Sequence, residues 1–366
     1  MKFDKAVENI SPIIQERYIN FINSLEFDMD SNLYFIYREY TGGDKYLPRP
    51  LLTFFGYLKD SNISKDTIYE TMEELGDLIL VPQVLRDVLA IHDDIVDEDL
   101  VKFSKPTLPT SYSYIAEKND GDTNLEMLKS GKDLALFFAD YLYSVLTNIV
   151  INSTVDNQIK IDTIKLINNT NIRTQQGQIK ELLLQNTSVK DIKKDFIIEL
   201  YRDKAACYCY SFPFELGLTI GRATDNLKKK SRDVLLKIGV ASQIIDDITG
   251  TFPGLLDHDK DSLGELINLR RTLLLVTLIE NVDENNLINR IVRQNKCTEE
   301  EALYIKESMI NSKVLEDSIE TVNQLVSDLP NEIKSLNFEK DTEEYLLDLL
   351  QSRVLTNLNI LKERVE

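Results

Sequence analysis

The chain has 366 residues, of which 43 % are apolar and 28 % charged, a balance typical of a soluble globular protein with a sizeable core. Its 61 acidic residues outnumber 42 basic ones, and the resulting formal net charge of −19 argues against general nucleic-acid binding. Three cysteines give no disulfide framework, and the scarcity of glycine and proline favours long helices over a sandwich or barrel with many turns.

The N-terminal residues have no apolar core of signal-peptide length, which favours a cytoplasmic location. Ser11 and Pro12 form the pattern of a cap residue followed by proline at the first helical position. We therefore predict that the first helix opens there. A loop rich in glycine, proline and basic side chains follows at residues 41–50.

Two helices are predicted between residues 65 and 100, with a break near Gly76 or Pro82. Further helices are predicted over residues 130–152 and 157–185. The first of these contains the most apolar stretch of the chain, which Asp140 interrupts. A membrane span needs about twenty largely uncharged residues. We therefore expect a helix buried in a protein core, and no transmembrane segment.

In the second half of the chain, Ser188 and Asp191 give a weak capping-box pattern for a helix that runs to about Ser211. Another helix is predicted over residues 225–249, and four or five more after residue 265. No run with the period of a strand is convincing. The predicted fold class is all-α, and the length alone allows one large domain or two smaller ones.

An acidic cluster stands at the end of the helix predicted before residue 100. Asp93 and Asp97 are one helical turn apart, and Asp94 precedes Asp97 by three residues. Three carboxylates this close repel one another unless hard cations lie between them. Mg²⁺ prefers oxygen ligands and often joins carboxylates to substrate phosphates. The pattern therefore indicates a magnesium site, although an acidic, solvated helix end would look the same in this segment alone.

A second acidic pair, Asp246 and Asp247, ends another apolar helix, and Gln243 lies on the same face as Asp246. Two such clusters on facing helices could clamp a diphosphate through Mg²⁺ ions, which neutralise the leaving group. Inward-pointing lysines or arginines would add charge stabilisation. The implied reaction is departure of diphosphate from an activated carbon, inside an apolar cleft that shields a carbocation from water.

Four segments in this order and at these separations resemble the trans-prenyl diphosphate synthases: H-D-D-I-V-D-E-D, G-Q-I-K-E, D-K-A-A and Q-I-I-D-D. The resemblance spans roughly residues 40–275. It implies a single domain over residues 1–366, built as one large bundle of long, mostly antiparallel helices around a central cavity, and a homodimer. The implied activity is the Mg²⁺-dependent condensation of an allylic prenyl diphosphate with isopentenyl diphosphate.

The resemblance also implies a role for each matching residue. Asp93 and Asp97 would bind Mg²⁺ ions that hold the allylic diphosphate, with Asp94 in support. Asp246 would hold a third Mg²⁺ ion. The other implied site residues are Gln243 and Asp247 beside that ion, Glu181 at a metal or its water, Gln178 in the same motif, Lys204 and Lys260 at the allylic diphosphate, and Lys45 and Arg49 at isopentenyl diphosphate.

Departures from the family pattern lie in the part that would bind isopentenyl diphosphate. Asp44 is inserted into the glycine loop before Lys45. Lys102 and Phe103 stand where the family has two arginines, and Lys102 could replace one of them as a point charge. Arg86 stands where the family often has histidine or glutamine for isopentenyl diphosphate, and it would restore the missing positive charge.

Three functions stay open. The first is a chain-elongating prenyltransferase that makes a longer trans-prenyl diphosphate. The second is a diverged class I terpene synthase or coupling enzyme, which ionises an allylic diphosphate without normal isopentenyl binding. The third is a non-catalytic subunit of a prenyl synthase complex, against which the intact first motif argues.

The resemblance also bears on product length. Bulky aromatic residues one turn before the first motif limit chain growth in the family, whereas this chain has Val88 and Leu89 there, and Leu85 a turn earlier. A product of geranylgeranyl length or longer is therefore predicted. Two aromatic pairs, Phe54–Phe55 and Phe137–Phe138, are assigned to the core rather than to a cation-stabilising wall.

Overall fold

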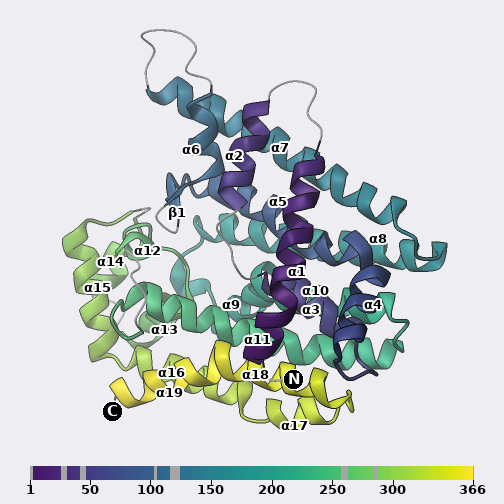
Figure 1. The fold of residues 1–366 in the computed structure, drawn as a ribbon. Helices are drawn as coiled ribbons and strands as arrows, with labels where there is room; N and C mark the ends of the chain where they lie inside the picture. Colours follow the sequence, from purple (N-terminus) through teal and green to yellow (C-terminus); the bar gives the residue numbers. More distant parts are fainter. Residues whose placement is uncertain are drawn as a thin grey trace. The chain divides into compact units, whose positions relative to one another are not determined.

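The computed structural model describes residues 3–25, 31–41, 47–102, 105–115, 124–256, 263–282, 287–294 and 296–365. These residues form helices and one two-stranded sheet, so the all-α prediction is confirmed (Figure 1). They divide into two compact units, each assembled from two separate stretches of chain. One unit comprises Met1–Leu166 with Pro213–Ala223, and the other comprises Ile167–Phe212 with Thr224–Glu366. A single domain over residues 1–366 stays a prediction.

In the first unit, α7 packs against α5 and α6, and α2 also contacts α6. The elements of this unit are α1 (Phe3–Ser24), α2 (Ser31–Thr41), α3 (Pro48–Tyr57), α4 (Lys65–Leu75), the 3-10 helix η1 (Gly76–Leu80), α5 (Val81–Val96), strands β1 (Val101–Lys102) and β2 (Lys105–Pro106), α6 (Leu108–Ser113), α7 (Asn124–Asn152), the first part of α8 (Asn157–Leu184), and α10 (Phe212–Ile220).

Helices α3 and α10 approach closely enough that only glycine fits at two positions. A Cβ atom added to Gly56 would lie 2.2 Å from a carbonyl oxygen of α10, and one added to Gly217 would lie 2.1 Å from Thr53 O. The Thr53 hydroxyl donates a hydrogen bond to the Pro213 carbonyl at 2.9 Å. This crossing joins α10 to the first unit despite its distance along the chain.

The second unit is organised around α11, which contacts η3, α9, α13, α16, α17 and η4. Its elements are the second part of α8, the 3-10 helix η2 (Val189–Asp191), α9 (Lys194–Tyr201), the π-helix η3 (Arg202–Ser211), α11 (Asp225–Thr251), α12 (Gly264–Ile267), α13 (Leu273–Asn281), α14 (Leu287–Ile291), α15 (Glu299–Asn311), α16 (Val314–Val326), α17 (Leu329–Lys334), α18 (Lys340–Leu350), the π-helix η4 (Gln351–Leu355) and α19 (Thr356–Val365).

The break predicted before the acidic helix is present, and both signals contribute to it. Gly76 ends α4 with a positive φ of 50°, a conformation that glycine adopts at little cost. The short η1 follows, and Pro82 then lies in the first turn of α5, where its missing N–H has no helical partner to lose. The break thereby defines where the helix that carries the acidic cluster begins.

Two predicted helix starts are wrong. Helix α1 begins at Phe3 and contains Pro12, because the buried side chains of Ile10 and Ile14 extend the apolar face across the proline. Ser188 precedes only the 3-10 helix η2 and makes no side-chain capping bond, while the following α-helix begins at Lys194. Tertiary packing outweighs the local start signal in the first case.

Helix α7 is buried on one face only. Leu142 and Leu146 are fully buried, as are Phe54 and Phe55 of α3, whereas Phe137 is 72 % exposed, so its assignment to the core is wrong. Among the described residues, the stretch Leu128–Asn152 is long and apolar enough to cross a membrane, and a third of its most apolar window is buried. One such helix is weak support for a membrane span, because core helices of soluble proteins pass the same test.

Candidate active site

The last turn of α5 carries the first acidic cluster. Asp93 and Asp94 lie in this turn, and Asp97 caps its C-terminus with an N–H that donates to the Asp93 carbonyl at 2.8 Å. Asp94 is buried, while Asp93 and Asp97 are partly exposed. Carboxylates at a helix C-terminus face the negative end of the helix dipole, so this arrangement needs a nearby cation.

A hairpin after α5 supplies that cation from Lys102. Strands β1 and β2 pair antiparallel, with Lys102 opposite Lys105. Glu98, in the turn between α5 and β1, has a positive φ of 57°. Thr107, directly after β2, donates its hydroxyl to the Asp99 carbonyl before β1 at 2.7 Å. The Lys102 ammonium lies 2.8 Å from Asp94 Oδ1 and 3.4 Å from Asp93 Oδ2.

Burial and charge act against each other at this ion pair. Burial raises the pKa of Asp94, while Lys102 and the hydroxyl of Tyr40 oppose that rise. Burial by itself would lower the pKa of Lys102, but Asp94 and Asp93 raise it overall. The ammonium therefore stays protonated beside both carboxylates. Lys102 is predicted to bind substrate, and the structure pairs it with Asp93, a predicted metal ligand, and with Asp94, its predicted support.

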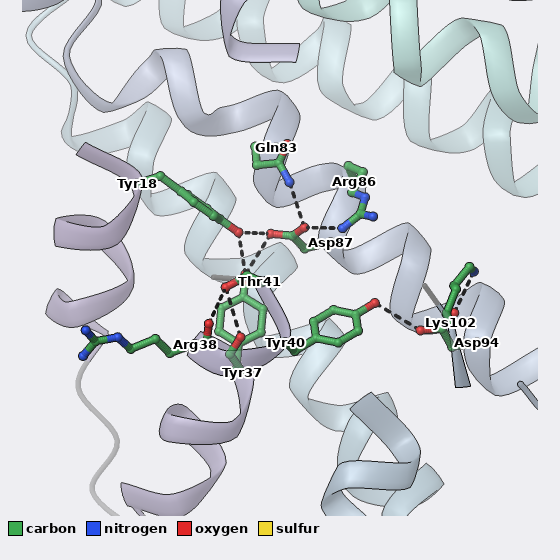
Figure 2. A network of polar contacts seen from close by, with 10 residues as sticks. All are labelled: Tyr18, Tyr37, Arg38, Tyr40, Thr41, Gln83, Arg86, Asp87, Asp94 and Lys102. Atoms are coloured by element: carbon green, nitrogen blue, oxygen red, sulfur yellow. Dashed lines mark hydrogen bonds and ion pairs between the residues drawn. The ribbon is translucent and has the colours of Figure 1, made fainter. Parts of the chain in front are cut away.

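Helix α2 reaches α5 through two tyrosines, as Figure 2 shows. Tyr40 donates its hydroxyl to Asp94 Oδ2 at 3.1 Å, and Tyr37 donates to Asp87 Oδ2 at 2.9 Å. Burial raises the pKa of both phenols well above the ordinary value, so both hydroxyls act as donors. These contacts attach α2 to the acidic helix at two carboxylates that lie two helical turns apart.

Asp87 is the centre of a buried polar network that sequence reasoning missed. It also accepts hydrogen bonds from the Tyr18 hydroxyl of α1, from Gln83 Nε2 at 3.1 Å and from Arg86 Nη1 at 3.3 Å (Figure 2). The available signal was an acidic residue two helical turns before Asp94, inside an apolar helix. Arg86, predicted to bind isopentenyl diphosphate, belongs to this network.

In the second unit, Gly177 allows α8 and the π-helix η3 to approach. A Cβ atom at Gly177 would lie 3.0 to 3.1 Å from backbone and Cβ atoms of Lys204. The Lys204 ammonium forms an ion pair with Glu181, one turn after Gly177 on α8. A π-helix is rare and frequently marks a functional site. Two predicted residues, one basic and one acidic, are thus brought together.

The end of α11 separates its two acidic residues by burial. Asp247 is buried and accepts hydrogen bonds from the Tyr201 hydroxyl and from Gln243 Nε2, the latter at 2.9 Å. Tyr201 in turn accepts the N–H of Leu273 at 2.9 Å, which ties α13 to the same network. Asp246 is exposed. Gln243 and Asp247 therefore brace this helix end, and sequence reasoning missed Tyr201.

Of the other predicted residues, the structure describes Arg49 and Gln178 but not the remaining ones. Arg49 lies in the first turn of α3, and Gln178 follows Gly177 on α8, both partly exposed. Lys45 and Lys260 lie outside the described residues, as does Phe103.

The carboxylate oxygens of the predicted metal ligands in each unit are of the kind that a hard divalent cation prefers. Within the described parts of the chain, no three His, Cys, Asp or Glu side chains gather closely enough to hold a metal by themselves. Mg²⁺ commonly binds through one or two carboxylates and completes its shell with water and phosphate oxygens. The space between Asp93 and Asp94 already accepts a cationic group, the Lys102 ammonium. Carboxylate oxygens with this charge demand suit Mg²⁺.

Comparison with known proteins gives a consistent family match. A family model described as polyprenyl synthetase matches residues 33–309. The geranylgeranyl diphosphate synthase of Sulfolobus acidocaldarius is 22 % identical over 310 residues, covering 80 % of this chain and 85 % of that protein. The geranylgeranyl diphosphate synthase of Saccharolobus solfataricus is 24 % identical over 311 residues, covering 82 % and 80 %.

A solved structure shares the fold. The geranylgeranyl pyrophosphate synthase of Corynebacterium glutamicum, complexed with isoprenyl diphosphate and magnesium, superposes with a TM-score of 0.79 at 18 % identity. The match covers 96 % of this chain and 99 % of that one. At this identity the likeness establishes the helical-bundle fold.

Proposed function

The chain belongs to the polyprenyl synthetase family and is a prenyltransferase, and we propose that it condenses an allylic prenyl diphosphate with isopentenyl diphosphate. The observation that carries this proposal is the end of α5. Two partly exposed carboxylates, Asp93 and Asp97, stand beside a buried one, Asp94, which Tyr40 and Lys102 hold in place. A helix keeps such repelling groups at a cost to its stability, which metal-bound diphosphate would offset.

Mg²⁺, when bound, would neutralise the negative charge that develops on the departing diphosphate. Asp93 and Asp97 would hold Mg²⁺ ions at the end of α5. Asp246 and Glu181 are the other proposed metal ligands, with three ions in total. Two of the chain's lysines, Lys204 and Lys260, would balance charge on the diphosphate directly.

The proposed reaction begins when the C–O bond of the allylic diphosphate breaks, leaving an allylic cation. The double bond of isopentenyl diphosphate then supplies the electron pair for the new C–C bond. A proton leaves the resulting cation to the released pyrophosphate, which regenerates a double bond. Lys45, Arg49 and Arg86 would hold the isopentenyl diphosphate, since cationic side chains form charge-assisted hydrogen bonds with phosphate oxygens.

The test incubates the purified protein with Mg²⁺ and farnesyl diphosphate, with and without labelled isopentenyl diphosphate. A longer, labelled prenyl diphosphate is expected, and replacing Asp93 and Asp246 by alanine should reduce its formation by about 10³-fold or more, because both would act on transition-state charge. Full activity of that double variant would contradict the proposal. Omitting Mg²⁺ or adding a chelator should also stop turnover.

A second function is favoured by one observation. Lys102, which replaces an arginine of the family pattern, is paired with Asp93 and Asp94. The Lys102 ammonium is therefore directed to the proposed metal ligands. The proposed binding site for isopentenyl diphosphate then has one cation fewer. A diverged enzyme that ionises allylic diphosphate without isopentenyl diphosphate would release hydrocarbon or alcohol in the same assay. No turnover of any allylic substrate would support a non-catalytic subunit.

A product of geranylgeranyl length or longer is proposed because aliphatic side chains, and no bulky aromatic ones, stand in the turns before the acidic motif. Val88, Leu89 and Leu85 are all buried on α5. The two relatives compared above are both named geranylgeranyl diphosphate synthase. A cytoplasmic location is proposed from the same family membership.

A homodimer is proposed from the outer face of α7. Phe137 and Ile151 are 72 % and 56 % exposed, and they lie about four helical turns apart on the same face. Large exposed apolar side chains that recur along one helix often mark a protein interface. A second copy of the chain, with the same face, would cover them.

A further inference from the structure

Helix α5 carries two parallel columns of polar side chains. Residues seven apart lie two turns along a helix and nearly on one line. One column contains Arg86, Asp93 and Asp97, which are partly exposed. The other contains Gln83, Asp87 and Asp94, whose exposed fractions are 2 %, 0 % and 1 %. The column of predicted ligand-binding residues thus lies beside a column of buried polar residues, Gln83, Asp87 and Asp94.

Asp87 is the most enclosed of these three residues, and it accepts hydrogen bonds from four different side chains. Two tyrosine hydroxyls, one side-chain amide and the Arg86 guanidinium converge on its two carboxylate oxygens. The hydroxyls of Tyr18 and Tyr37 also lie 3.4 Å from each other. A carboxylate buried in this way is tolerated only because its oxygens are fully paired.

Stability alone is a poor reason for this arrangement. Replacing a buried ion pair by apolar side chains of similar volume is often neutral or stabilising. Arg86 and Asp87 are also sequence neighbours, whose side chains leave a helix about 100° apart. The guanidinium must therefore bend toward the carboxylate, and this contact selects one orientation for a long side chain that is otherwise rich in rotamers.

We propose that Asp87 is a positioning residue for Arg86: its buried carboxylate, locked by Tyr18 and Tyr37, fixes the guanidinium for contact with the diphosphate of isopentenyl diphosphate. This inference rests on the proposed function, in which Arg86 meets that diphosphate. It adds two further elements to the site, α1 through Tyr18 and α2 through Tyr37. Tyr18 precedes residues 33–309, which the family model matches, so its hydrogen bond to Asp87 involves a residue outside that match.

The experiment measures binding of isopentenyl diphosphate to the full-length protein by calorimetry, without allylic substrate. Asp87→Asn keeps the side-chain size but removes the charge that orients Arg86. Its Kd should rise about tenfold, which corresponds to ~1.4 kcal/mol. Tyr37→Phe should raise the Kd about threefold, because the Tyr18 hydroxyl still holds the carboxylate. The KM for the allylic substrate should change less than about twofold in both variants.

A double-mutant cycle separates positioning from structural support. In the background Arg86→Gln, where no guanidinium remains to orient, Asp87→Asn and Tyr37→Phe should each change the Kd less than about twofold. Glu332→Gln, which breaks the 2.6 Å ion pair with Lys237 in the second unit, is the matched control and should leave the Kd unchanged. Thermal unfolding of each variant verifies that it is folded. If Asp87→Asn does not fold, the double-mutant cycle is measured with Tyr37→Phe and Arg86→Gln alone.

The inference is overturned if the losses persist in the Arg86→Gln background, or if isopentenyl and allylic substrates are affected equally. A wild-type protein that elongates its allylic substrate while showing either result retains the proposed function. If the wild type binds no isopentenyl diphosphate, the inference and the proposed elongation both fall. Formation of hydrocarbon or alcohol in the turnover assay would then identify the alternative enzyme.

Discussion

In each acidic pair, one aspartate is buried and hydrogen-bonded, and its neighbour is open to solvent. Asp94 and Asp247 are buried and tied by tyrosine hydroxyls, while their sequence neighbours Asp93 and Asp246 are more exposed. Adjacent side chains leave a helix about 100° apart, so only one of each pair can face inward. The doubled aspartate therefore gives one residue that anchors the helix end and one that can reach a ligand.

Val88→Phe on α5 should shorten the product by at least one five-carbon unit. Val88 is 2 % exposed, so the added ring must occupy space on the inner side of the helix, where the prenyl tail is proposed to lie. Product analysis by mass spectrometry measures the effect, with Val88→Ile as a control of smaller volume. An unchanged product would show that the tail takes another path.

His92 should make the protein less stable at mildly acidic pH. Burial lowers the pKa of His92 below its ordinary value of 6.5, and Asp140 only partly opposes this. Between the lowered pKa and 6.5, the unfolded chain binds more protons than the folded one, so the unfolding free energy falls as the pH falls. His92→Gln should lack this part of the decline.

Denaturant unfolding of both proteins from pH 7.5 to about 5 measures that difference, since all other titrations are shared. Parallel pH profiles of wild type and His92→Gln would contradict the prediction.

At the scale of elements, backbone approach places the site residues of the second unit. The π-helix η3 contacts α8 at Gly177 through Lys204, and it contacts α11 at Gly239 through Ala206 and Tyr210. A Cβ atom at Gly239 would lie 2.5 Å from the Cβ of Ala206. Both glycines therefore set the position of Lys204 relative to Glu181 and the end of α11.

Gly239→Ala should destabilise the protein by about 1–3 kcal/mol, because the methyl group overpacks the contact with Ala206. Allylic substrate binding should weaken as η3 shifts and carries Lys204 with it. Denaturant unfolding and the KM for the allylic substrate measure these effects.

Gly264→Ala is the control for Gly239→Ala, since a Cβ added at Gly264 would have no atom within 4 Å outside its chain neighbours and its own helix backbone. It should leave both quantities nearly unchanged. Equal stability of the two variants would contradict the packing argument.

At the scale of the whole molecule, net charge and exposed apolar surface lead to two predictions, one about divalent cations and one about self-association. A net charge of −19 repels free diphosphate, so the basic residues of the site and the proposed Mg²⁺ ions must reverse the potential locally. The described residues leave large apolar side chains exposed along α7, including Phe137. The first feature predicts dependence on divalent cations, and the second predicts self-association.

Phe137→Glu should convert a dimer to a monomer, because it would bury a charge in the proposed contact between copies. Light scattering after size exclusion measures the mass of both proteins. Tyr69→Glu, a similar change at a 54 % exposed aromatic residue on α4, should leave the dimer intact. A wild-type monomer at micromolar concentration would contradict the proposal.

The sequence by itself determined the helical class, most helix positions and the family. Helical periodicity, the scarcity of glycine and proline, and the break at Gly76 and Pro82 are local properties of the chain. The spacing of Asp93, Asp94 and Asp97 is likewise readable, because one helical turn fixes which of them are neighbours. The failures at Pro12 and Phe137 came from the tertiary environment, which local patterns do not contain.

Only the tertiary structure decided which side chains meet. Tyr18 and Tyr37 lie 69 and 50 residues before Asp87, and no local pattern links residues so far apart. The same holds for Lys204 with Glu181 and for Tyr201 with Asp247, which come from separate helices. Helix packing brings these groups together and buries Asp87 and Asp247. Burial thereby separates the carboxylates that make internal hydrogen bonds from those proposed to bind a ligand.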